Sequence, residues 1–360
     1  MGHPKGILFQ SITSINICHL IDLNTRYIVY ILCIMYLFFH LLLFIIILLM
    51  YIHISNQYKT SEDLEIYELE YSDNKYLQEV CDVKQPSVFN YRNVNPDFFD
   101  KVNSETIEEL GVYDVKVKDT QDYWNENIDI DYVVMPLQSS LSLMKTDTHS
   151  NYITEDNDTF VEEAGLFKHF KENDLFLRPP MTVQTKYDIM SGSQKSCMPF
   201  RFHKHCRHFI SVHSGKVRIK LTPWKSCKYL YPINDYDCFE FRSPINIWKP
   251  QRKFFHEMDK MKFLEFDITE GQMLYIPPYW WYSVQYLDSS NLICGITYDN
   301  IISTMANLKD SGLYLLQQSN TKTKIVKTID IPVSTSEIET DKNEDANEAT
   351  NDINAVPSSI

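Results

Sequence analysis

The sequence predicts a mainly β domain, of the sandwich or small-barrel kind, preceded by one N-terminal transmembrane helix. Three observations support this prediction. A strongly apolar, uncharged segment runs from Tyr27 to Met50. From Asp188 onward, short runs with β-type alternation are separated by turn residues, and no long helical pattern lies between them. Beyond about Ser319 the sequence is rich in Thr, Asp, Glu, Asn and Lys, which is typical of disordered chain.

The apolar segment is long enough to cross a bilayer. No Asp, Glu, Lys or Arg lies between Arg26 and Lys59. About 20 helical residues at ~1.5 Å each cross a hydrocarbon layer of about 30 Å. A secretory signal peptide fits poorly because the run is too long and begins late, and a buried core helix is rarely apolar on every face. We therefore expect residues 27–54 to form a transmembrane helix of a single-pass membrane protein.

The flanking charges indicate an orientation for this helix. Lys5 and Arg26 precede it, whereas Lys59 and then an acidic stretch follow it. This small excess of Lys and Arg on the N-terminal side predicts that residues 1–26 are cytoplasmic and that the domain is lumenal or extracellular.

Behind the helix the composition divides the chain into three parts, namely a polar, acidic stalk, a globular domain and a disordered tail, at residues 55–75, 76–318 and 319–360. Within the domain, Glu105–Leu110 and Phe160–Glu172 are predicted to be short helices. The polar stretch from Thr146 to Asp158 predicts a loop. Asn157 in this loop begins an Asn-Asp-Thr acceptor sequence for N-glycosylation, which would be accessible in a lumenal domain.

The formal net charge of −14 argues against a nucleic-acid-binding surface, because such binding depends on Lys and Arg. A basic cluster is explained as alternate solvent-facing positions of two strands; its members are Lys204, Arg207, Lys216, Arg218 and Lys220. The expected partners are therefore the membrane and an unidentified protein or small molecule. The abundance of Ile, Asn, Lys and Tyr is typical of an AT-rich genome, such as that of a large DNA virus.

The predicted strands are clearest around a hairpin. Ser214-Gly215 is a two-residue turn signal between the runs Arg207–His213 and Lys216–Leu221. Further strands are predicted at Lys262–Ile268, Met273–Ile276, Trp280–Tyr286 and Leu292–Thr297.

The segment from Glu270 to Tyr282, EGQMLYIPPYWWY, resembles the second half-motif of the cupin-like Jumonji C oxygenases, and most closely the asparaginyl-hydroxylase subgroup. In that family an acidic-Gly turn leads into a buried strand, an Ile-Pro corner, a Trp-Trp pair and then a metal-binding His. The segment from His208 to Trp224 is similar to the family's other diagnostic hairpin, and Cys81–Phe89 is similar to its opening strand. The resemblance covers roughly residues 76–318.

This resemblance implies a double-stranded β-helix, which is a jelly-roll-like cupin barrel, with flanking helices. In active members of the family a His-x-Asp/Glu pair and a distal His bind Fe(II), and 2-oxoglutarate completes the coordination. Here the distal position holds Tyr282. The proximal pair falls on Phe202 and Lys204 or, with one gap, on Arg201 and His203.

A further departure concerns the cosubstrate, because the lysine that would bind 2-oxoglutarate is replaced by Val217. Our first hypothesis is therefore a membrane-anchored, non-catalytic binding or interaction module that needs no cofactor. Its ligand pocket would be the barrel mouth, with a lining of Tyr279, Trp281, Tyr282 and Val217.

Two alternatives remain open. One is a metalloenzyme with a rearranged site, which binds iron with 2-oxoglutarate, or zinc, through His203, His205 and His208. Against it, the histidine spacing matches no recognised zinc pattern, and pocket-lining or surface histidines are more common. The other is a structural membrane protein whose resemblance to the oxygenases is accidental.

Overall fold

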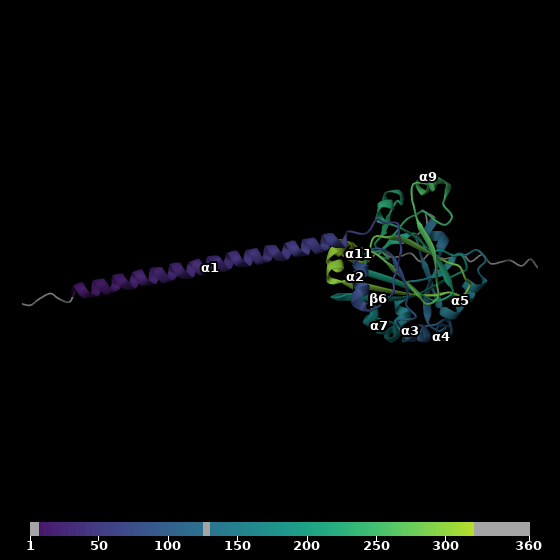
Figure 1. Cartoon of the computed structure of the whole chain (residues 1–360), viewed down its shortest axis with the longest axis horizontal. Coiled ribbons are helices and arrows are strands. Elements are labelled where there is room, and N and C mark those ends of the chain that lie inside the picture. The colour runs from purple at the N-terminus through teal and green to yellow at the C-terminus, as the bar shows by residue number, and fades with distance from the viewer. Residues whose placement is uncertain (1–6, 125–129, 320–360) are drawn as a thin grey trace, which may run out of the picture. The chain divides into compact units, whose positions relative to one another are not determined.

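Residues 7–124 and 130–319 are described in a computed structural model (Figure 1). Helix α1 comprises Ile7–Gln57, so the predicted transmembrane segment lies inside a longer helix. The stretch Arg26–Gln57 is long and apolar enough to span a membrane, and its apolar side chains are exposed rather than packed on the domain. Of the predicted disordered tail, residues 319–360, Ser319 ends α11 and residues 320–360 lie outside the described residues.

The remaining chain is built on two sheets, which confirms the predicted mainly β fold. The larger sheet has, in spatial order, β1 (Tyr67–Glu68), β2 (Ser87–Asn90), β13 (Gln272–Ile276), β8 (Arg207–Ser214), β15 (Leu292–Asn300), β6 (Thr182–Gly192), β5 (Tyr152–Thr154), β3 (Asp114–Asp119) and β4 (Tyr132–Pro136). The smaller sheet has β10 (Ile233–Asp235), β11 (Glu240–Arg242), β7 (Arg201–Phe202), β14 (Trp281–Tyr286), β9 (Lys216–Thr222) and β12 (Leu264–Thr269).

The two sheets share a buried apolar core, as in a jelly-roll-like barrel. Val212 and Ile293 of the larger sheet belong to the same buried cluster as Ile219 and Val284 of the smaller sheet. These residues come from the alternating positions of the predicted strands, because successive side chains of a strand point to opposite faces. The sequence alternation therefore identified the inner face of the barrel.

Helices cover the other face of the larger sheet. Phe98 and Phe170 pack edge to face, with ring centroids 5.2 Å apart, in a buried cluster that also holds Phe209 of β8. The helices of the domain are α2 (Asn74–Asp82), α3 (Pro96–Lys101), α4 (Ser104–Glu109), α5 (Leu137–Thr146), α6 (Asp158–Glu163), α7 (Phe167–Glu172), α8 (Asp174–Leu177), α9 (Phe255–Met258), α10 (Ile301–Ala306) and α11 (Leu308–Ser319). Three 3-10 turns, Thr120–Trp124, Trp224–Tyr229 and Arg252–Phe254, complete the regular structure of the described residues.

The predicted hairpin is present as β8 and β9, which turn at Ser214-Gly215. Gly215 has φ of +76°, a conformation that favours glycine, and a Cβ atom there would lie 2.6 Å from the carbonyl oxygen of Ser290. Glycine is therefore required at this turn for both conformational and steric reasons.

The structure corrects the prediction that residues 55–75 form a stalk. Gln57 still belongs to α1, and β1 pairs in parallel with β2, where the Tyr67 amide donates to the Pro86 carbonyl at 2.9 Å. Leu69 is buried. The acidic side chains of the segment face outward, while Leu69 packs into the core and the backbone adds an edge strand to the sheet.

The prediction of N-glycosylation at Asn157 is also corrected, because this residue is only 1% exposed. Its amide nitrogen donates to Thr154 Oγ1 and to the Ile189 carbonyl, both at 2.8 Å, and its amide oxygen accepts from the Lys116 backbone at 2.8 Å. A glycan on this nitrogen would disrupt these bonds, so the structure contradicts the predicted glycosylation site. The predicted loop around it also contains β5.

Buried His213 makes the stability of the domain depend on pH. It stacks on Phe99 with ring centroids 4.3 Å apart, and its Nδ1 donates to the Val102 carbonyl at 2.5 Å. Burial lowers its pKa from 6.5 to about 4. The unfolded chain therefore binds more protons between these two pH values, so stability falls as the pH drops through this window.

We expect His213→Gln to lessen this acid destabilisation by up to roughly 3 kcal/mol, the free energy that corresponds to the pKa difference of one group. Urea unfolding, followed by Trp fluorescence at the two ends of the window, measures the difference. His149→Gln, at an exposed histidine, is the control and should behave like the wild-type chain. An unchanged pH dependence in H213Q would contradict the assignment.

Candidate functional site

The register between β7 and β14 decides which of the two predicted proximal pairs faces Tyr282. Tyr282 lies directly opposite Arg201, and Trp281 lies opposite Phe202. The Arg201 guanidinium carbon is 5.8 Å from the centre of the Tyr282 ring. The gapped alignment, with Arg201 and His203, is therefore the one that puts the pair beside Tyr282.

The other pair points away from this site. Phe202 packs on Trp281 with ring centroids 4.8 Å apart, in a separate aromatic cluster. Lys204 lies over Phe241 and forms an ion pair with Asp310 of α11 at 2.8 Å. Neither residue contributes to the barrel interior.

Three of the predicted residues form a compact group, here called the histidine cluster, which consists of His203, His208 and Tyr282. The ring centroids of His203 and His208 are 4.8 Å apart, and those of His208 and Tyr282 are 5.6 Å apart. His205 lies next to the cluster, with its ring centroid 5.7 Å from that of His203. The sequence thus predicted residues that do come together from three separate strands and loops.

Hydrogen bonds orient the imidazole rings toward protein atoms. His203 Nε2 is 3.1 Å from the carbonyl oxygen of Ile276, to which it donates. His208 Nδ1 is 2.9 Å from Thr297 Oγ1, and His205 Nδ1 is 2.6 Å from a carboxylate oxygen of Asp299. His203 Nδ1 is buried and has no hydrogen-bond partner within the described residues.

The histidine cluster is uncharged at neutral pH. Burial, followed by the effects of His208 and His205, holds the pKa of His203 well below its usual range. Burial also lowers the pKa of His208 to about 3. Burial raises the pKa of the Tyr282 phenol more than the neighbouring Arg201 lowers it, so its hydroxyl stays protonated.

Beside this neutral cluster lies a buried ionic network. Arg201 Nη2 is 2.5 Å from Glu155 Oε2, and Arg201 Nη1 is 3.1 Å from Glu155 Oε1 and from Glu240 Oε1. Lys118 Nζ and the Tyr123 hydroxyl also donate to Glu155, at 3.0 and 3.1 Å. Burial alone would raise the pKa of Glu155, but Arg201 and Lys118 lower it, so the carboxylate is ionised.

Sequence reasoning missed Glu155, which lies 46 residues from Arg201 in a stretch predicted to be a loop. One signal was available. The sequence has no carboxylate between Ser191 and Asn234, so a buried Arg201 needed an acidic partner from elsewhere in the chain.

The 2-oxoglutarate position is also apolar. Val217 is fully buried between the sheets, while the adjacent Lys216 and Arg218 face outward and form ion pairs with Asp267, both at 2.7 Å. No side chain at this point of β9 offers an inward-facing charge to a dicarboxylate.

These residues do not fit the family's iron and 2-oxoglutarate. Among residues 7–124 and 130–319, no group of three or more His, Cys, Asp or Glu side chains could hold a metal ion. The Asp299 carboxylate, which pairs with His205, also accepts from Ser303 at 2.9 Å. A fixed guanidinium has no lone pair for a metal and repels a cation electrostatically.

The structure also contradicts the predicted pocket, because its four residues do not line one space. Val217 and Tyr282 belong to the core between the sheets, whereas Tyr279 and Trp281 belong to the aromatic cluster on the opposite side of β14. Adjacent strand residues point to opposite faces, so Trp281 and Tyr282 cannot both line the barrel interior.

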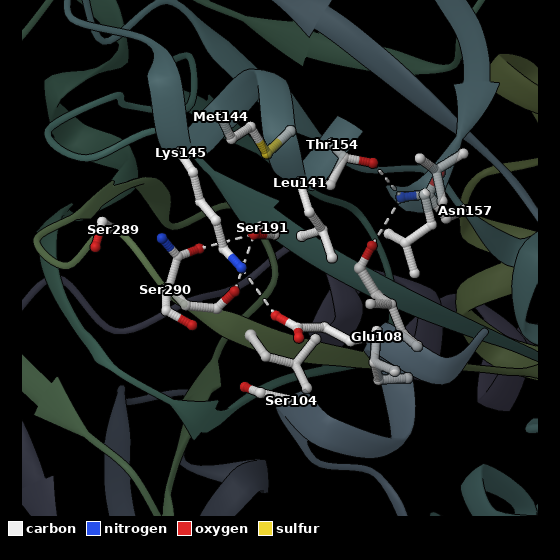
Figure 2. A pocket seen from close by; sticks show the side chains of 16 residues that line it. Ser104, Glu108, Leu141, Met144, Lys145, Thr154, Asn157, Ser191, Ser289 and Ser290 are labelled. Carbon is white, nitrogen blue, oxygen red and sulfur yellow. Dashed lines mark hydrogen bonds and ion pairs between the residues drawn. The ribbon is translucent and has the colours of Figure 1, made fainter. Parts of the chain in front are cut away.

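A cavity lies elsewhere, beside α4, α5 and the loop before β15 (Figure 2). Its volume is about 540 Å³, including space open to solvent. Figure 2 shows Lys145 and Glu108 pointing toward each other, and their ion pair measures 3.0 Å. The apolar part of the wall consists of Ile107, Val115, Leu137, Leu141, Met144, Ile189 and Leu292.

Comparison with known proteins gives a family match that spans most of this domain. The family model described as cupin-like domain matches residues 67–304. HSPB1-associated protein 1 of Homo sapiens is 26% identical over 130 residues, which is 36% of this chain and 26% of that protein. The Rattus norvegicus protein of the same name is 28% identical over 98 residues, which is 27% of this chain and 20% of that protein.

The chain thus covers no more than about a quarter of the length of these curated relatives. The family match, by contrast, extends from β1 to α10 and includes both sheets. On this evidence the chain belongs to the cupin-like, Jumonji C-type domain family.

Proposed function

We propose that this chain is a membrane-anchored cupin-like protein whose domain acts as a non-catalytic binding or interaction module. The observation that carries the proposal is the position of Arg201. Its guanidinium, held by Glu155 and Glu240, lies across from Tyr282, where the family resemblance assigns two of the iron ligands. A permanently charged side chain supplies there the positive charge that a metal would bring.

Further observations support a binding role. The cavity beside α4 and α5 is shallow, largely apolar and open to solvent, which suits a single apolar side chain of a protein partner. The relatives are named for association with a protein, HSPB1, and this favours a protein partner for the cupin-like domain. The strongly acidic net charge makes nucleic acid an unsuitable partner.

The anchor in this proposal is the stretch Arg26–Gln57 of α1. The excess of Lys and Arg before the span favours a cytoplasmic N-terminus and a domain on the lumenal or extracellular side. Digestion of sealed membrane vesicles with an added protease tests this orientation. Without detergent, the protease cleaves the domain only where the domain lies on the outer face of the vesicle.

One observation favours the second candidate, a metalloenzyme with a rearranged site. The unpartnered Nδ1 of His203 is a buried acceptor near two other imidazoles, and such an atom suits zinc. The hydrogen bonds of His205 and His208, and the absence of a group of three suitable donors among the described residues, weigh against it.

Metal content distinguishes the two candidates. We expect the full chain, purified in detergent under anaerobic and reducing conditions, to carry far less than one equivalent of iron or zinc by mass spectrometry. The matched control is the triple variant R201H/H203D/Y282H, which rebuilds a His-x-Asp and distal His set on the same strands. We expect this variant, if it folds, to gain Fe(II) binding.

Stoichiometric zinc or iron in the wild-type chain, lost in His203→Ala, would instead establish the metalloenzyme. Turnover of 2-oxoglutarate by the wild-type chain would also overturn the non-catalytic proposal, whatever the behaviour of the triple variant.

The ionic network is expected to contribute strongly to the stability of the domain. Glu155→Gln removes a buried charge that compensates Arg201 and Lys118, so we expect a loss of about 3 kcal/mol or more in the free energy of unfolding. Urea unfolding measures the loss. Glu265→Gln, which affects half-exposed pairs with Arg218 and Lys220, is the control and should cost about 1 kcal/mol or less. Equal losses would contradict a special role for the network.

A further inference from the structure

The last two helices of the domain carry apolar side chains that the domain does not cover. Leu308, Leu315 and Leu316 are 65% to 68% exposed, and their spacing places them on one face of α11. Ile301 and Met305 of α10, one helical turn apart, are 45% and 42% exposed. These five residues are here called the leucine face, and exposed apolar groups of this kind mark interaction sites.

The other side of α11 is bound to the domain. Asp310 pairs with Lys204 at 2.8 Å and accepts a hydrogen bond from the Tyr236 hydroxyl at 3.0 Å. Tyr314 packs edge to face on Phe239, with ring centroids 5.7 Å apart. Because these contacts fix the polar side inward, the leucine face must point outward.

The leucine face lies next to the end of the candidate membrane span. The last part of α1 contacts α10, and the Tyr58 hydroxyl, just after α1, donates to the Ala306 carbonyl at 2.6 Å. Figure 1 shows α11 at the edge of the domain where α1 arrives. Any bilayer around α1 is therefore near α10 and α11.

The junction between α1 and the domain is held by buried Lys84. Its ammonium group donates to the carbonyls of Asn56, of Gln57 at 3.2 Å and of Lys59 at 2.8 Å. The first two carbonyls belong to the last turn of α1 and have no partner inside the helix, and the third lies two residues beyond its end. Lys84 therefore caps α1 and joins it to the domain without a flexible linker.

The length of α1 sets the distance between the domain and the bilayer. Gln57 lies seven positions after Met50, the end of the continuous apolar run. At ~1.5 Å per residue they extend about 10 Å, whereas the headgroup layer on one side is roughly 5–8 Å thick. A domain capped onto residues 56–59 must then lie at the membrane surface.

We propose that the leucine face of α10 and α11 inserts into the boundary between headgroups and acyl chains of the bilayer that α1 spans. The occupant of this surface is lipid, and the contact fixes the orientation of the domain on the membrane. This proposal rests on the anchoring part of the proposed function and is independent of whether the domain is catalytic.

Quenching of Trp fluorescence by brominated lipid tests the contact. Full-length Leu315→Trp and Leu308→Trp variants are reconstituted into phosphatidylcholine vesicles, with or without bromine on the acyl chains near the headgroup. Val112→Trp, at an apolar position that is 80% exposed and distant in sequence from both helices, is the matched control. The wild-type chain gives the signal of the native tryptophans.

We expect the fluorescence contributed by Trp at 315 and 308 to be largely lost in brominated vesicles, and that of Trp at 112 to be retained. Equal quenching at all three positions would overturn the proposal. A blue-shifted but unquenched Trp at 315 would also overturn it, since a second copy or another protein would then cover this face.

Alkaline extraction of the same vesicles separates this proposal from the anchor. A chain that stays in the membrane but shows no quenching at 315 and 308 contradicts only the lipid contact. A chain that is extracted contradicts the anchor, and the lipid contact with it.

Discussion

The ion pair between Arg201 and Glu155 is the interaction on which the architecture of the barrel interior depends. Arg201 belongs to β7 of the smaller sheet, and Glu155 directly follows β5 of the larger sheet, so the pair joins the two sheets. Taking either charge out of water alone would cost several kcal/mol. Glu155 is 1% exposed, and its oxygens accept from Arg201, Lys118 and Tyr123. Each buried charge thus has a partner of opposite sign.

The two residues after Glu155 are held by buried contacts of their own. Asp156 has φ of +60° and binds both Lys118 and Lys186, at 2.7 and 3.1 Å, while its own amide donates to Asp188 at 2.9 Å. Asp tolerates this left-handed conformation better than most residues. Asn157 then closes the turn with its three buried hydrogen bonds. An apparently ordinary acceptor sequence for glycosylation is therefore a structural corner of the barrel.

The parts of the fold that sequence reasoning predicted are those set by local pattern. The strands around Gly215 and the segment from Glu270 to Tyr282 have period-two alternation and strong turn residues, and the structure confirms strands at both. Tyr282 was predicted as a site position because the second half-motif left little freedom in alignment, whereas His203 was one of two registers counted back from Gly215. The structure adds that Arg201, and not Phe202, is the residue across from Tyr282.

The parts that were missed depend on contacts between distant segments. Glu155 and Arg201 meet through tertiary packing that no local period reveals. β1 consists of two residues in a polar segment, and it exists because β2 offers a free edge. The composition of residues 55–75 reflects their side chains alone. It therefore predicted a stalk, although the backbone of this segment is part of the sheet.

The junction with α1 also bears on the histidine cluster. The Tyr279 amide donates to the His203 carbonyl at 2.9 Å, and the Tyr279 ring lies 6.1 Å from that of Tyr58, just after α1. The loop after His203 is further held by Asn307, whose amide nitrogen donates to the Lys204 carbonyl at 2.9 Å. The elements that we assign to the membrane surface thus brace the loop that carries the histidines.

These contacts fix the elements that surround the loop after His203. Lys204 and Asn307 hold the loop after His203 against α11 and the end of α10, and Lys84 holds the end of α1. Binding of a partner at the cavity beside α4 and α5 requires no movement of these elements, because that cavity already opens to solvent. In the proposed function, the domain would present this outer surface to a partner while its inner charges maintain the barrel.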